Sequence, residues 1–120
     1  MDLSDILAKH AGWKLKFREA IAHKETMDAE SISKDDHCGF GKWLHSEGKS
    51  KFGNLSGFSE CVIKHAAFHV EAGKVAQVVN DKKYEEAEAM LGFDTPYTKA
   101  SNAFGVAIRH LREEVKKTEV

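Results

Sequence analysis

The sequence is poor in residues that interrupt helices and in features that mark several classes of protein. Pro96 is the one proline, and two cysteines are too few for the disulfide framework of a small secreted domain. No apolar run approaches the roughly 20 residues that span a bilayer, and the first ten residues lack a signal-peptide pattern. The formal net charge of −1 provides no strong attraction for nucleic acid or an acidic membrane. We therefore expect a cytoplasmic protein with neither kind of partner.

The size and composition are typical of one soluble globular domain. The chain has 120 residues, of which 42% are hydrophobic and 31% are charged, which is enough apolar material for one core. Basic and acidic residues alternate along the last helix-like segment, as on a solvated helix face. We expect residues 1–120 to form a single domain.

Apolar residues recur in long segments with the 3.6-residue period of a helix, and no segment alternates as a strand would. The segment DHCGFGKWLH suggests a further, short helix with Asp36 as its N-cap and Gly48 just past its end. Thr95 is expected to cap a helix that starts at Pro96. The predicted helices cover about 3–24, 37–46, 58–80, 84–91 and 96 onward. The sequence thus predicts an all-α fold like a four-helix bundle, with a short extra helix that carries Cys38.

Three of the seven histidines lie on apolar helix faces. Helical spacing of about 100° per residue places His10 near the centre of the first apolar face and His65 and His69 at the middle of another. A buried imidazole costs free energy unless its ring finds partners. The spacing His65-x-x-x-His69 brings two ring nitrogens within chelating reach. Each of these features alone is more often a matter of packing, and it is their combination with a suitably placed cysteine that indicates a metal site.

Cys38 supplies a fourth ligand of suitable chemistry. In the first turn of the short helix, free N–H groups favour a thiolate. Gly39 and Gly41 are expected to let this turn approach the bundle closely, and Trp43 is expected to anchor it against the core. One thiolate and three imidazoles match the ligand set of a closed tetrahedral zinc site.

The chain resembles the bacterial chemoreceptor zinc-binding domain (CZB) family. The resemblance rests on three motifs, which are His10-x-x-Trp13, HCGFGKWL over residues 37–44, and His65-x-x-x-His69. It implies a small helical bundle, usually a homodimer, attached to a chemoreceptor or a diguanylate cyclase. It implies zinc held by His10, Cys38, His65 and His69, with Trp13, Gly39, Gly41 and Trp43 as supporting motif residues.

The resemblance also implies a sensory or regulatory role in bacterial chemotaxis or cyclic-di-GMP signalling. The signal would be zinc, or hypochlorous acid that oxidises the ligand thiol of Cys38. The expected bundle accounts for residues 1–120, and no signalling domain is recognised within them. A free-standing member, favoured by the start at Met1, and an excised module are the alternatives.

We expect no enzymatic activity, because a closed four-ligand site has no open position for water or substrate. One alternative is a purely structural zinc that supports dimerisation. Another is a hemerythrin-like di-iron oxygen-binding protein, which would need more core histidines and bridging carboxylates. The candidate carboxylates lie outside the apolar helix faces; they are Glu60, Glu71 and Glu86. A soft thiolate ligand also favours zinc over a di-iron centre.

The remaining cysteine and histidines are set aside as ligands. Cys61 is expected to be a buried apolar residue. His37 could support or replace a ligand, although its side chain should point away from that of its neighbour Cys38. We expect His23, His45 and His110 at or near the surface.

Overall fold

The computed structural model describes residues 2–118, and these residues form helices and connecting turns without any strand. This confirms the all-α prediction. The helices are α1 (Leu3–Ala11), α2 (Trp13–His23), α3 (Ala29–Ser33), α4 (Gly39–Leu44), α5 (Glu47–Phe52), α6 (Ser56–Asn80), α7 (Tyr84–Met90) and α8 (Pro96–Thr118). None of the helices in this part of the chain is long and apolar enough to cross a membrane.

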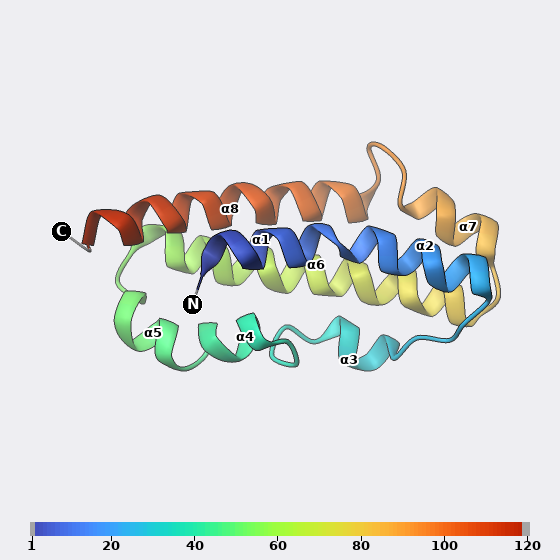
Figure 1. Ribbon diagram of the computed structural model, residues 1–120, viewed down its shortest axis with the longest axis horizontal. Helices are drawn as coiled ribbons and strands as arrows, with labels where there is room; N and C mark the ends of the chain where they lie inside the picture. The colour runs from blue at the N-terminus through green and yellow to red at the C-terminus, as the bar shows by residue number, and fades with distance from the viewer. Residues whose placement is uncertain (1, 119–120) are drawn as a thin grey trace.

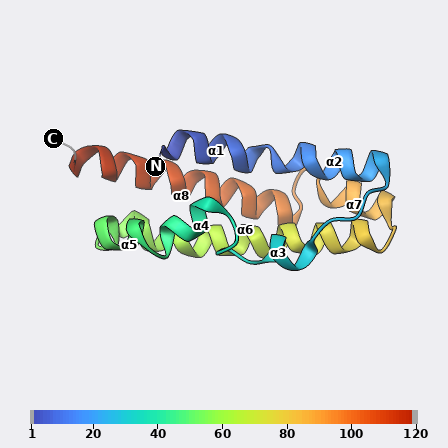
Figure 2. The same ribbon diagram turned by 60° about the horizontal axis from the view of Figure 1, so that its bottom comes forward.

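The helices form four antiparallel layers, as in an up-down-up-down bundle (Figure 1). The layers are α1 with α2, the row of α3 to α5, the long α6, and the long α8 (Figures 1 and 2). The helix α7 lies beside α2 and α6 at the end of the bundle opposite the two termini. The second of these layers, α3 to α5, is a row of short helices where a regular bundle has one long helix.

The three predicted long helices are present, with small differences at their ends. The first is divided at Gly12 into α1 and α2, as expected for a weak helix former within a helix. The N–H of Ser4 donates to Oδ1 of Asp2 (2.9 Å), which caps α1. The N–H of Thr98 donates to Oγ1 of Thr95 (3.2 Å), so the predicted cap of α8 is confirmed.

The predictions for the short helices were partly wrong. The cap of α4 is Cys38 and not Asp36, because the N–H of Gly41 donates to the Cys38 Sγ atom (3.3 Å). Gly48 lies inside α5, in a segment predicted as a loop. A Cβ at Gly48 would come within 2.7 Å of the Trp43 ring, so this glycine makes room for the indole. The polar segment after α2, which shows little periodicity, contains α3.

The two motif glycines have different roles from those expected. A Cβ at Gly41 would overlap the main-chain carbonyl oxygen of Asp35, so the closest approach is to the preceding turn. At Gly39 a Cβ would meet no described atom within 4 Å, and the expected close approach there is wrong. Trp43 stacks on Phe40 with ring centroids 5.8 Å apart and packs against the core, as predicted.

Candidate metal centre

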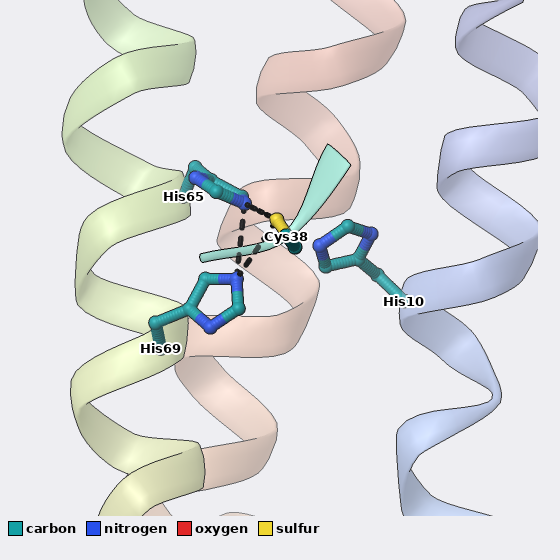
Figure 3. Close-up of side chains that lie close together, drawn as sticks. All are labelled: His10, Cys38, His65 and His69. Carbon is teal, nitrogen blue, oxygen red and sulfur yellow. Dashed lines mark hydrogen bonds between the residues drawn. The ribbon is translucent and has the colours of Figure 1, made fainter. Parts of the chain in front are cut away.

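Four side chains from three layers of the bundle meet in its interior (Figure 3). His10 comes from α1, Cys38 from the residue before α4, and His65 and His69 from successive turns of α6. One ligand atom from each residue lies within 4.8 Å of the other three. The three imidazoles are buried and Cys38 is half-buried. The four residues predicted as ligands from the sequence are therefore brought together by the fold.

The separations among the ligand atoms of Cys38, His65 and His69 match the edges of a tetrahedral zinc site. The Cys38 Sγ atom is 3.4 Å from Nε2 of His65 and 3.6 Å from Nε2 of His69. The two Nε2 atoms are 3.0 Å apart. Bond lengths of about 2.05 Å to nitrogen and 2.3 Å to sulfur give edges of about 3.3 Å between nitrogens and about 3.6 Å between sulfur and nitrogen. The donor set and its spacing thus fit zinc.

Two of the ligand candidates are oriented by main-chain carbonyl groups. The Nδ1–H of His10 donates to the Ile6 carbonyl (3.0 Å), and that of His69 donates to the Ile32 carbonyl (2.8 Å). Both bonds direct the Nε2 lone pair into the cluster, as is usual for metal-binding histidines. Nε2 of His10 is buried without a hydrogen-bond partner among the described residues. A metal ion would satisfy this atom.

These two carbonyl partners were not predicted from the sequence. Ile6 lies four residues before His10 in the same helix, so the predicted helix alone could have suggested it. Ile32 belongs to α3, a helix of five residues that the periodicity did not reveal. No side-chain pattern marks a main-chain acceptor on such a segment. Nδ1 of His65 is buried and has no partner in the described part of the chain.

Burial keeps the three imidazoles neutral at physiological pH. Desolvation lowers the pKa of His10 to about 4, although its bond to the Ile6 carbonyl acts in the opposite direction. Desolvation, with the neighbouring His69, lowers the pKa of His65 to about 2. The pKa of His69 is also lowered by desolvation, against the effect of the Ile32 carbonyl and the charge of Asp35. Neutral imidazoles are the form that binds zinc.

Aromatic rings enclose the cluster on the side of the core. The His10 ring centroid lies 4.8 Å from that of Phe104 and 5.5 Å from that of Phe68. The ring of Phe40 lies 5.1 Å from that of His65 in an edge-on arrangement. These rings exclude water from that side. No carboxylate belongs to the cluster among residues 2–118, which gives no support to a di-iron centre.

The residues set aside occupy the expected places. Cys61 is fully buried, and desolvation raises the pKa of its thiol to about 12, so it is an inert apolar side chain. His37 is exposed beside Asp36, with its Nε2 atom 3.7 Å from the carboxylate. The other three histidines are exposed, two of them beside carboxylates; they are His23, His45 and His110.

The zinc-free protein is expected to lose stability as the pH falls from about 6.5 towards 4. An unfolded histidine has a pKa of about 6.5, whereas that of folded His10 is about 4. The unfolded chain therefore binds more protons in this range, which removes about 3 kcal/mol for His10 alone by pH 4. Urea unfolding between pH 7.5 and 5 measures the loss, and His10→Leu should have a shallower pH dependence. Stability that does not change over this range would contradict the prediction.

Comparison with known proteins agrees with the geometry. The family model described as the chemoreceptor zinc-binding domain matches residues 10–76, more than half of the chain, and this range contains all four clustered residues. No curated protein and no solved structure is significantly similar to the chain. The family consists of zinc-binding signalling modules and is not a catalytic family. The chain therefore belongs to the chemoreceptor zinc-binding domain family, and zinc is its cofactor.

Proposed function

We propose that residues 1–120 form a single zinc-binding sensory module whose ligands are His10, Cys38, His65 and His69. The observation that carries this proposal is the convergence of three imidazoles and one thiol within 4.8 Å of one another, with the ligand atoms of Cys38, His65 and His69 at tetrahedral zinc spacing. The matched family associates such a module with chemoreceptors. The module has no catalytic activity of its own, since all four tetrahedral positions are filled by protein atoms.

Cys38 is the ligand through which the module responds to an oxidant. Zinc, when bound, holds the four ligands together and keeps the sulfur in its thiolate form. The Cys38 sulfur attacks the chlorine of hypochlorous acid and hydroxide leaves. Water then replaces chloride on sulfur, which gives a sulfenic acid, chloride and a proton. The sulfenic acid is a weaker ligand than the thiolate, so oxidation favours zinc release.

Loss of the Cys38 ligand would change the contact between two layers of the bundle. Cys38 is both the N-cap of α4 and one point at which the row of α3 to α5 meets the histidines of α6; the Ile32 carbonyl of α3, which accepts from His69, is another. Without the Cys38 link, α4 is held to these histidines less firmly than α3 and can shift relative to α6. Such a shift would be read by a second copy in a homodimer and by a chemoreceptor or diguanylate cyclase. These are the partners of a cytoplasmic bacterial module in chemotaxis or cyclic-di-GMP signalling.

Zinc content and zinc release under oxidant test this function. The purified protein is expected to hold about one zinc per chain, and hypochlorous acid should release it in step with oxidation of Cys38. A chromogenic indicator follows the zinc, and peptide mass spectrometry follows the thiol separately from the three methionines. Cys38→Ala should retain zinc weakly and show no oxidant-dependent step.

Two outcomes would point to the alternatives. Zinc that stays bound after Cys38 is oxidised would make the metal structural, with a role in dimerisation. Abundant iron that the Cys38→Ala change does not affect would support an oxygen-binding di-iron protein.

A further inference from the structure

A surface cavity leads to the metal centre between α1, α2 and the start of α4. Its volume is 740 Å³, and Cys38 and His10 both line it. Ile6 and Phe40, which are buried, line its inner part, and exposed side chains of α1 and α2 line its outer part. A second cavity of 290 Å³ reaches His10 from the side of α8, but Cys38 is not part of its lining. The larger cavity thus connects the half-buried thiol with solvent.

Gly39 lies on this cavity, directly after Cys38, and the fold gives no reason for a glycine there. Its φ is not positive, and a Cβ would meet no described atom within 4 Å. The absence of a side chain at this position leaves open the space beside the thiol. Gly41 differs from Gly39, because the backbone of the preceding turn leaves no room for a Cβ at Gly41.

The charged side chains that line the cavity favour the entry of a negatively charged small molecule. Lys9 and Lys16 contribute two positive charges and Glu19 contributes one negative charge. The Lys16 ammonium lies 4.5 Å from the Trp13 ring centroid, which holds it over the lining of the cavity. An excess of positive charge around a cleft raises the local concentration and the arrival rate of anions.

We propose that this cavity is the access route by which small anions reach the Cys38 sulfur. Gly39 keeps the route open, and Lys9 and Lys16 favour anionic over neutral reagents of the same size. The ligand class is a monoanion of a few non-hydrogen atoms, such as hypochlorite, which takes up a proton from water to give the hypochlorous acid that the Cys38 sulfur attacks. This inference rests on the proposed role of Cys38 at the zinc site.

The first test measures how fast Cys38 in the zinc-loaded protein is alkylated. Iodoacetate and iodoacetamide have almost the same size and the same leaving group, but only iodoacetate is charged. Gly39→Leu should slow both reagents about tenfold, and Gly39→Ala should slow them less, because each fills part of the route. Lys42→Leu is the matched control, since Lys42 is an exposed residue of α4 that does not line the cavity, and it should leave both rates unchanged.

The second test separates the effect of the cavity's charge on the alkylation rate from the effect of its open space. The double variant Lys9→Gln, Lys16→Gln should slow iodoacetate about three- to tenfold and leave iodoacetamide unchanged. The difference should shrink at about 1 M salt, where charges are screened within roughly 3 Å. Lys14→Gln is the control, because Lys14 lies on α2 but lines a different cavity. Buried Cys61 should stay unmodified throughout.

Each outcome bears on one of the two proposals. Unchanged alkylation in Gly39→Leu, or equal effects of the lysine changes on both reagents, would overturn the access route. Zinc content measured on the same samples tests the ligand set independently. Wild-type protein without zinc would overturn the proposed function, and charge-selective alkylation of Cys38 would still establish the route.

Discussion

Gly41→Ala is expected to lose most of its zinc and about 2–4 kcal/mol of stability, whereas Gly39→Ala keeps both. A Cβ at Gly41 would overlap the carbonyl oxygen of Asp35 and lie 3.2 Å from the Cα of Asp36. A main-chain atom cannot rotate away as a side chain can, so the turn itself must move. The Gly41 N–H also donates to the Cys38 sulfur (3.3 Å), and displacement of this turn therefore moves the proposed ligand.

The comparison with Gly39→Ala isolates this effect. Both changes add one methyl group to the first turn of α4, but the methyl group at Gly39 meets no described atom within 4 Å. Metal analysis and urea unfolding of the two proteins, with and without added zinc, provide the measurement. Equal zinc content and equal unfolding midpoints would show that the turn before α4 is not held in place as the structure indicates.

The features that the sequence predicted correctly are those that repeat over several helical turns. The 25 residues of α6 and the 23 of α8 give many periods in which apolar and polar positions separate. The same regularity placed His65 and His69 on the core face. His10 followed from the long apolar stripe that α1 shares with α2. The fold brings these three histidines together in one cluster, and their role as zinc ligands is a proposal.

The features that the sequence missed depend on contacts between distant residues. Helices of five or six residues, such as α3 and α5, contain too few turns for a period to be recognised. Isolated helices of this length are unstable in water, so packing against the rest of the bundle must support them. Gly39 and Gly41 look equivalent in the sequence. Only the position of the Asp35 carbonyl in space distinguishes them.

His65→Ala is expected to weaken zinc binding by more than about 100-fold, beyond the 10- to 100-fold typical of losing an outer-shell partner. The His65 Nε2 atom lies 3.4 Å from the Cys38 sulfur and 3.0 Å from Nε2 of His69, so it is adjacent to two of the other candidate ligand atoms. Alanine would leave an apolar gap beside Phe40 and Phe104, which cannot supply a ligand. Competition with a chelator of known affinity measures the change.

Thermal unfolding provides a second measurement of how much zinc binding depends on His65. Zinc at 100 times its dissociation constant should stabilise the wild-type protein by about 2.7 kcal/mol, and the same concentration should hardly affect His65→Ala. His37→Ala is the matched control, because His37 is next to Cys38 but exposed to solvent, and it should behave as the wild type. Circular dichroism at low temperature would show that both variants are still helical. Wild-type affinity in His65→Ala, with loss of zinc in His37→Ala, would exchange the two residues in the ligand set.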